Sequence, residues 1–223
     1  MATIAALPMY DWPELQAAND VAWAAIRDLL RSKSIDAPEE LAREATDLHR
    51  LWRDPDLLLS QTCWGPMELG LSAYVQVVDQ PDYSPYEGGQ GPNYSSAIVA
   101  RRGSDNRLRG RRFAFNSPDS RSGYLGLRAD LEKEGVGLSI FSEMIETGGH
   151  RASIIAVAEG RADVAAIDCK TWALARLHEP ASQELTPIGW TTMRLGLPFI
   201  TSMATPPETV QALREALAAY PPP

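Results

Sequence analysis

Residues 150–177 of this chain read HRASIIAVAEGRADVAAIDCKTWALARL, and they decide the fold class. The first ten residues predict a helix from His150 to Glu159, which Gly160 ends because glycine readily takes the left-handed conformation found after a helix. The apolar run 162–167 then predicts a buried strand, and 169–177 predicts a second helix. Helix, strand and helix in direct succession indicate an α/β architecture.

The same alternation continues toward both ends of the chain. Short apolar runs predict strands at 3–7, 56–60, 74–78, 94–101, 112–116, 187–191 and 197–201. Amphipathic or capped segments predict helices at 12–32 (with Asp11 as its N-cap), 39–52, 120–131 and 208–219. Strands that alternate with helices predict mostly parallel sheets with helices on both faces.

Two segments interrupt this rhythm. Residues 79–93 are rich in turn-forming residues and have no period, which predicts one long loop of the kind that is often functional. Residues 102–112 are basic and polar and contain two glycines, which predicts a crossover between two lobes.

Composition limits the classes of function. The chain has 223 residues, of which 44% are hydrophobic, and a net charge of −8, so it can build a core but repels polyphosphate backbones. We therefore expect no nucleic-acid partner, although a few aimed N–H groups can still bind a small anion. The two cysteines, Cys63 and Cys169, form no metal-binding cluster, and the sequence does not indicate whether they pair.

The first residues of the chain and its apolar segments bear on localisation. The apolar segments are too short for a transmembrane helix. The first residues have neither a basic start nor a long apolar stretch, so they predict a strand and not a secretory signal. We expect a cytoplasmic protein if the chain is complete, and a periplasmic one if an export signal has been removed.

An anion pocket is predicted where the strand at 112–116 meets the next helix, at the sequence NSPDSRSGY (116–124). The first N–H groups of a helix have no internal partners, and the helix dipole adds partial positive charge there. Ser120 and Ser122 add hydroxyl donors, and Gly123 lets a ligand approach the backbone closely. The alternative is an ordinary serine N-cap.

His150 and Asp168 are the other candidates in this half of the chain. His150 follows two glycines at a helix start, where it can donate a hydrogen bond to an anion or simply face solvent. Asp168 ends a buried strand, the place where ligands gather in open α/β sheets, so it either caps the next helix or binds a cationic group. The sequence contains no nucleophile elbow, phosphate loop or dinucleotide fingerprint.

Three stretches together resemble a known family. They are AALPMYDWPE (5–14), SPDSRSGY (117–124) and GHRA…VAEGRADVAAID (149–168). They are similar to the phosphate/phosphonate-binding family of ABC-importer substrate-binding proteins. The resemblance implies a type II periplasmic-binding-protein fold, with two α/β lobes and a ligand cleft between them. Lobe 1 would be residues 1–103 plus 193–223, and lobe 2 would be residues 104–192.

The resemblance also implies roles for single residues. Ser120 and Ser122 match the hydroxyls that hold the phosphonate, His150 matches the histidine at the second helix start, and Tyr94 looks like the family's cleft tyrosine. Members that bind aminoalkylphosphonates place acidic residues around the amine. Where such a glutamate would align, this chain has Lys170.

The far side of the ligand is expected to contact lobe 1. The loops after its first two strands carry Tyr10 and Trp64, which can supply apolar walls with polar tips, or can simply pack in the core. Asp168 would approach from lobe 2. If it is free to bind, a ligand with an ammonium group is favoured; if it only caps a helix, ligand choice ignores the amine.

Two functions from different classes follow from these observations. The first is a binding protein for a small anionic solute, such as phosphonate, phosphate or a similar oxyanion, in an ABC-type importer. It would be a monomer without enzymatic activity, cofactor or metal, and a transporter permease would be its partner. The alternative is a cytosolic enzyme or sensor on the same fold, acting on a small carboxylate or phosphate compound. The lack of an evident acid/base pair or activated nucleophile favours binding.

Overall fold

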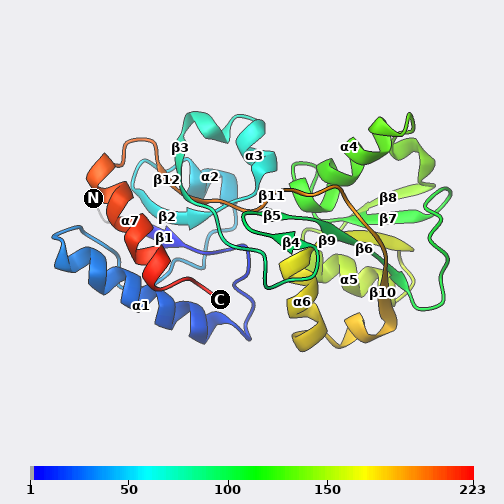
Figure 1. Cartoon of the computed structure of the whole chain (residues 1–223), viewed down its shortest axis with the longest axis horizontal. Coiled ribbons are helices and arrows are strands. Elements are labelled where there is room, and N and C mark those ends of the chain that lie inside the picture. Colours follow the sequence, from blue (N-terminus) through cyan, green and yellow to red (C-terminus); the bar gives the residue numbers. More distant parts are fainter. Residues whose placement is uncertain (1–2) are drawn as a thin grey trace. The chain divides into compact units, whose positions relative to one another are not determined.

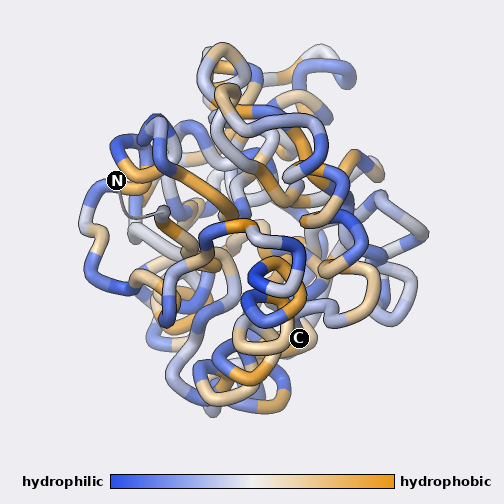
Figure 2. The backbone as a smooth tube through the Cα atoms, turned by 90° about the vertical axis from the view of Figure 1, so that its left-hand side faces the viewer, coloured by the Kyte–Doolittle hydropathy of each residue, from blue (hydrophilic) through white to orange (hydrophobic). Residues whose placement is uncertain are grey.

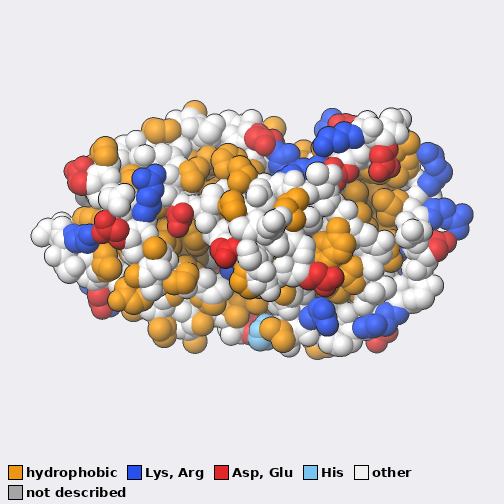
Figure 3. Space-filling view, in the orientation of Figure 1, with side chains coloured by type: hydrophobic (Ala, Val, Ile, Leu, Met, Phe, Trp, Pro, Cys, Tyr) orange, Lys and Arg blue, Asp and Glu red, His pale blue; other side chains and the backbone are white. Residues whose placement is uncertain are grey.

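The computed structural model describes residues 3–223 and divides them into two compact units (Figure 1). Unit 1 contains the described residues up to Pro81 together with Leu197–Pro223, and unit 2 is Asp82–Gly196. No helix among the described residues is long and apolar enough to cross a membrane. On the face drawn in Figure 3, acidic and basic side chains are interspersed.

Unit 1 is built on a four-stranded sheet with the order β1-β2-β12-β3. Its strands are β1 (Ile4–Ala6), β2 (Leu57–Gln61), β3 (Val75–Asp79) and β12 (Phe199–Ser202). Its helices are α1 (Gln16–Ser32), α2 (Leu48–Trp52), α3 (Trp64–Glu68) and α7 (Pro207–Ala219), with a 3₁₀ turn at Leu71–Ala73. Helices α1 and α7 lie side by side (Figure 1) and bury Trp23, Ile26 and Leu213 in one core.

Two helices of unit 1 differ from the prediction. Helix α1 begins at Gln16, and Asp11 does not cap it: the Asp11 carboxylate accepts hydrogen bonds from Asn19 Nδ2 at 2.8 Å and Arg43 Nε at 2.6 Å. Of the predicted helix 39–52, only α2 forms. The backbone just before it is held by other elements, because Pro38 O accepts from the Trp23 indole at 3.2 Å and Ala42 N donates to Ala5 O at 2.7 Å.

Unit 2 contains a five-stranded sheet with the order β10-β6-β9-β7-β8 and a small three-stranded sheet with the order β11-β5-β4. The strands of the large sheet are β6 (Ser96–Arg101), β7 (Arg112–Phe115), β8 (Glu143–Glu146), β9 (Val164–Asp168) and β10 (Leu185–Trp190). The small sheet consists of β4 (Gly89–Gln90), β5 (Asn93–Tyr94) and β11 (Arg194–Leu195), so the predicted loop 79–93 includes part of a short hairpin.

The helices of unit 2 follow the predicted order. They are α4 (Gly126–Lys133), α5 (His150–Ala158) and α6 (Cys169–His178), and the π-helical turn η2 (Arg121–Leu125) leads directly into α4. Short 3₁₀ turns lie at Leu138–Ile140 and Pro180–Glu184. Gly160 follows α5 with φ of 76°, which confirms the predicted helix end. In Figure 2, both hydrophilic and hydrophobic residues occur along the helical coils, as expected for helices that cover sheets.

The boundaries between the two units lie at other residues than the predicted boundaries between the two lobes. Residues 82–103 belong to unit 2, because β6 lies inside its large sheet with β9 and β10 as neighbours. Residues 193–196 stay in unit 2 through the pairing of β11 with β5. The segment 102–112 therefore does not link the units; its backbone bonds within unit 2, for example from Gly110 N to Ile140 O at 2.7 Å.

The two-unit α/β architecture is as predicted, but the sheets are mixed and not mostly parallel. Strand β7 is parallel to β8 and β9, and β1 is parallel to β2. Strand β6 is antiparallel to both of its neighbours, and so is β12. Parallel neighbours need a long crossover connection, usually a helix. Strand β12 starts two residues after the chain enters unit 1, so no helix delivers it.

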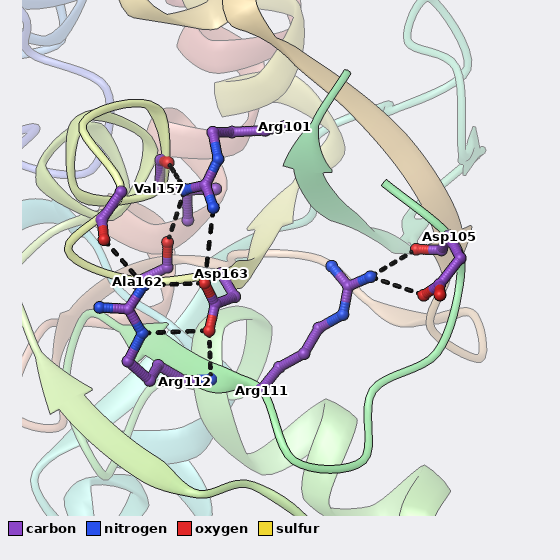
Figure 4. Close-up of polar contacts among 8 residues, drawn as sticks. Arg101, Asp105, Arg111, Arg112, Val157, Ala162 and Asp163 are labelled. Atoms are coloured by element: carbon purple, nitrogen blue, oxygen red, sulfur yellow. Dashed lines mark hydrogen bonds and ion pairs between the residues drawn. The ribbon is translucent and has the colours of Figure 1, made fainter. Parts of the chain in front are cut away.

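An ion-pair cluster fixes the turn between α5 and β9 (Figure 4). The Asp163 carboxylate accepts from Arg112 N at 2.9 Å and from the Arg112 guanidinium at 2.8 Å, with Arg101 at 3.6 Å. Arg101 also donates to the carbonyls of Val157 and Ala162 at 2.8 and 3.2 Å. These contacts join the end of α5 to β6 and β7, and so hold α5 against the sheet.

Candidate functional site

Three helices of unit 2 begin at the same edge of the large sheet. Strands β7, β8 and β9 are parallel, so their carboxyl ends lie together. The turn η2 follows β7, α5 follows β8, and α6 follows β9 directly. This topology brings together four of the residues that the sequence singles out: Ser120, Ser122, His150 and Asp168.

Close polar contacts join these four residues into one cluster. The Ser122 hydroxyl lies 2.7 Å from His150 Nε2, and Asp168 Oδ2 lies 3.3 Å from the same nitrogen. Ser120 Oγ accepts from the N–H of Gly123 at 3.0 Å and lies 3.4 Å from Ser122 Oγ. Ser120, Ser122 and Asp168 are all buried.

The protonation state of His150 decides what the serines can do. Burial lowers the pKa of His150, against the opposing effect of the Asp168 charge, so the ring is neutral. Because Nε2 faces a carboxylate oxygen, the proton of the neutral ring belongs on Nε2. Nε2–H then donates to Ser122 Oγ, with an Asp168 carboxylate oxygen 3.3 Å from the same nitrogen, and the Ser122 O–H keeps its own proton for another acceptor. Ser120 likewise accepts from a backbone N–H and keeps its proton, so the cluster offers two hydroxyl donors.

Although Ser122, His150 and Asp168 meet, they do not form a hydrolytic triad. A triad needs the carboxylate on Nδ1 and the hydroxyl on Nε2, so that the ring can take a proton on one side while it is held on the other. Here the serine and the aspartate both contact Nε2. The arrangement positions hydrogen-bond donors and does not activate a nucleophile.

Asp168 also caps a helix. Its Oδ1 accepts from Thr171 N at 2.9 Å at the start of α6, while its Oδ2 faces His150. The capping role considered from the sequence is therefore present, and both carboxylate oxygens have contacts within the protein. Whether Asp168 also meets a cationic ligand group stays a prediction.

Gly123 is required by packing against a residue that the sequence analysis did not single out. A Cβ at Gly123 would lie 1.7 Å from Asn116 Oδ1 and 3.3 Å from His150 Cε1. Asn116 Oδ1 is itself buried without a hydrogen-bond donor among the described residues. Asn116 directly follows β7, so its place at the carboxyl end of a predicted strand is the signal that would have identified it.

The loop before α5 holds His150 in place. Thr147 N donates to Phe115 O at 2.8 Å, and Gly148 N donates to Asn116 O at 2.9 Å, so this loop is tied to the end of β7. The Thr147 hydroxyl lies 2.6 Å from the Ser153 hydroxyl in the first turns of α5. Gly148, two residues before α5 begins, has φ of 82°, a left-handed conformation that favours glycine.

Comparison with known proteins assigns the chain to a family. The family described as the periplasmic substrate-binding protein of phosphonate ABC transporters matches residues 68–222. The chain belongs to this phosphonate-binding family. Among proteins of curated function, none matches the chain significantly in sequence.

Solved structures similar to this phosphonate-family protein share its fold. PhnD1 from Prochlorococcus marinus, solved with methylphosphonate, is 18% identical with a TM-score of 0.72, over 97% of this chain and 83% of that one. A binding-protein component of a phosphonate transporter from Pseudomonas aeruginosa is 17% identical with a TM-score of 0.69, over 96% of this chain and 73% of that one. A Xanthomonas citri protein bound to chloride is 17% identical with a TM-score of 0.69, over 97% of this chain and 82% of that one. At these identities the likeness establishes the fold of two-lobed periplasmic binding proteins.

Tyr94 lies near the same sheet edge as Asp168 in this phosphonate-family protein. It ends β5, two residues before Ser96, and Ser96 of β6 pairs with Asp168 of β9. The Tyr94 side chain is buried, with its ring 5.5 Å from that of Tyr83. The predicted strand 94–101 included Tyr94, whereas in the structure Tyr94 ends β5 and β6 begins at Ser96. Contact of Tyr94 with a ligand stays a prediction.

Tyr10 and Trp64 belong to unit 1. Tyr10 is buried in the segment after β1, and Trp64 begins α3 after β2. Because β1 and β2 are parallel, both residues follow the same edge of the unit 1 sheet, as predicted. The Trp64 indole donates to Gln80 Oε1 at 3.1 Å, and the side chain packs against the core around Leu57, so core packing accounts for part of its role. Their part in ligand binding stays a prediction.

The two cysteines form no disulfide bond in the described residues. Cys63 and Cys169 are both buried. Burial raises the pKa of the Cys169 thiol, with the Asp168 charge acting in the same direction, so this thiol is protonated at neutral pH.

Proposed function

We propose that this protein binds a small tetrahedral oxyanion of the phosphonate class, as the substrate-binding protein of an ABC importer. The observation that carries the proposal is the pair of hydroxyl donors, Ser120 and Ser122, oriented by the Gly123 N–H and by neutral His150. With the His150 proton on Nε2, His150 donates to Ser122 and the Gly123 N–H donates to Ser120, so both hydroxyl protons are available to an anion. Family membership supports this assignment.

The electrostatics of the site support an anion over a neutral solute. The N-termini of α5 and α6 start at the sheet edge that carries the serines, and helix N-termini favour negative charge. Hydroxyl and N–H donors that are already oriented cost little to bring together when the ligand binds. The oxyanion is therefore held by aimed donors despite the protein's net charge of −8.

The test is calorimetric titration with methylphosphonate. The double change Ser120→Ala with Ser122→Ala removes both hydroxyl donors and should weaken binding by about 2 to 4 kcal/mol, roughly 30-fold or more, because hydrogen bonds to charged groups are worth ~1–2 kcal/mol each. Ser142→Ala changes an exposed serine of the same unit and should leave the affinity unchanged.

Two results contradict the proposal. One is a folded double variant that binds methylphosphonate as tightly as the wild type. The other is a wild-type protein that binds none of methylphosphonate, phosphate and sulfate at millimolar concentration. Circular dichroism on each variant separates loss of the site from loss of the fold.

Delivery to a transporter is the finer part of the proposal. We place the protein in the periplasm as a monomer, with a cognate ABC permease as its partner and Tyr10, Trp64 and Tyr94 contacting the ligand beyond the phosphonate group. Co-purification of ligand-loaded protein with that permease, compared with the Ser120/Ser122 double alanine variant, tests the partner. Size-exclusion chromatography with light scattering tests the monomer.

A further inference from the structure

Unit 2 contains a cavity of about 480 Å³ that shares no residue with the anion site formed by Ser120, Ser122, His150 and Asp168. Helix α6, the 3₁₀ turn at Pro180–Glu184 and strand β10 supply most of its lining. Strand β10 lies at the edge of the five-stranded sheet. Small-molecule sites usually have volumes of about 300–1,000 Å³, so this cavity is large enough for a ligand of its own.

Trp172 and Arg176 of α6 both line this cavity. They are four residues apart, so they lie next to each other on one face of the helix. Trp172 is 4% exposed, and its indole N–H has no hydrogen-bond acceptor among residues 3–223. A buried N–H donor without an acceptor is unfavourable, and a ligand oxygen beside this face of α6 would supply the acceptor that the protein does not.

The charged side chains of the lining favour a ligand with one negative charge. Arg102 and Arg176 line the cavity together with a single acid, Glu87. In the described part of the chain neither arginine forms an ion pair: Arg102 Nε donates to the Gln183 carbonyl at 2.6 Å, and the Arg176 guanidinium donates to no protein group. The lining therefore carries a surplus of one positive charge, which matches a monoanion, and Glu87 opposes a second negative charge on the ligand.

Trp190, at the end of β10, supplies an aromatic wall of the cavity. Its ring packs on the backbone of Gly88, because a Cβ at Gly88 would lie 2.4 Å from Trp190 Cζ3. Neither Trp190 nor Trp172 is paired with another aromatic ring of residues 3–223. An aromatic ring of a ligand would therefore pack against a tryptophan that its neighbours already hold in place, at little cost in conformational freedom.

We propose that this cavity binds a small aromatic monocarboxylic acid. The carboxylate accepts from the Arg176 guanidinium and from the Trp172 N–H, and the ring packs against Trp190. A hydrogen bond between ionised groups is about twice as strong as one between neutral groups, which favours a carboxylate over a neutral acceptor. The inference does not depend on the proposed function, because the cavity lies within unit 2 and has no residue in common with the anion site.

The experiment titrates the protein with 2-naphthoate by calorimetry and compares it with 2-naphthamide, which has the same ring but no charge. The wild type should bind 2-naphthoate about tenfold or more tighter than 2-naphthamide, which corresponds to one charge-assisted contact. Arg176→Gln removes the guanidinium and should weaken 2-naphthoate binding about tenfold while it leaves 2-naphthamide binding nearly unchanged. Arg109→Gln removes an exposed arginine of the same unit that does not line the cavity, and should keep the full preference for 2-naphthoate.

The indole N–H signals in an NMR spectrum give a second readout, which a general effect of charge does not move. Trp172→Phe removes one of these signals and so assigns it to Trp172. In the wild type 2-naphthoate should shift this signal, and Trp172→Phe should bind 2-naphthoate about fivefold more weakly because it lacks the N–H donor. Trp190→Leu removes the aromatic wall and should weaken the binding of both probes. Thermal unfolding of each variant checks the fold.

Four results would overturn the inference. They are a wild type that binds no 2-naphthoate at millimolar concentration, a wild type that binds 2-naphthamide as tightly as 2-naphthoate, a folded Arg176→Gln variant with wild-type affinity, and loss of 2-naphthoate binding in the Ser120/Ser122 double alanine variant. The last result would place the acid in the anion site, whereas the inference expects this variant to bind 2-naphthoate like the wild type. Failure of the wild type to bind methylphosphonate would count against the proposed function alone.

Discussion

Substitution of Gly123 by alanine tests the geometry of the anion site directly. The added Cβ would lie 1.7 Å from Asn116 Oδ1 and 2.8 Å from Asn116 Cγ, whereas an ordinary contact is 3.4 Å or more. The Asn116 side chain therefore has to leave its position. It would also press on His150, whose Cε1 lies 3.3 Å away.

The size of the effect follows from two opposing contributions. Forcing extra atoms into a packed site costs about 1–3 kcal/mol. Replacing glycine by alanine restores about 0.4–1 kcal/mol through the lower entropy of the unfolded chain. We expect Gly123→Ala to reduce the free energy of unfolding by about 1–2 kcal/mol, and to weaken methylphosphonate binding about tenfold because Ser120 and His150 are displaced.

Urea unfolding and calorimetric titration measure both effects. Gly137→Ala is the matched control, because a Cβ at Gly137 would meet no heavy atom within 4 Å and its φ of −134° suits alanine. Its stability should change by no more than about 0.5 kcal/mol. Adding Asn116→Ala to Gly123→Ala removes the clashing amide and should recover part of the lost stability. Our account of this packing would be refuted if Gly123→Ala behaved like Gly137→Ala, or if Asn116→Ala gave no recovery.

Three further predictions follow from other parts of the structure. Hydrogen bonds from Arg112 hold the pKa of Asp163 at about 2, below its ordinary 3.8. This carboxylate therefore adds about 1–2 kcal/mol to the free energy of unfolding above pH 4, and this contribution is lost as the pH falls through about 2. Acid unfolding of Asp163→Asn should not show this loss. Burial lowers the pKa of Lys170 to about 8 from 10.5, so the unfolded chain binds more protons between these values, and wild-type stability should rise with pH across that window. Lys170→Met should show no such rise and should be more stable than the wild type below pH 8, by up to about 3 kcal/mol in urea unfolding. If Trp64 contacts the ligand, methylphosphonate should change the fluorescence of the wild type but not that of Trp64→Phe.

Much of the local structure could be predicted, because it depends on residues close together in the chain. The start of α6 at Cys169, the end of α5 before Gly160 and the cap at Ser120 all follow from short patterns. The predicted helix 12–32 has the correct apolar face but starts too early. Asp11, its predicted N-cap, instead accepts a hydrogen bond from Arg43, which is 32 residues away. An N-cap is predicted from the residues next to it, and these residues do not show that a distant arginine binds the same carboxylate.

The candidate site was predicted as separate residues and not as a cluster. Ser120, Ser122, His150 and Asp168 lie in three segments, and each is ambiguous in its own segment. Their contacts exist because β7, β8 and β9 are parallel neighbours, so that the three following helices begin at one edge. Asn116 was overlooked for the same reason, since its relation to Gly123 is a matter of packing and not of spacing.

By itself the sequence determined the α/β class, most of the elements, the resemblance to a binding-protein family and the residue types of the anion site. Hydrophobic periodicity, helix caps and helix-ending glycines act over one or two helical turns, so they can be recognised in the sequence alone. Only the tertiary structure decided the unit boundaries, the antiparallel directions of β6 and β12 and the shared nitrogen of His150 between Ser122 and Asp168. These features depend on which distant strands pair and on where side chains from different elements meet, and neither is encoded in any single segment.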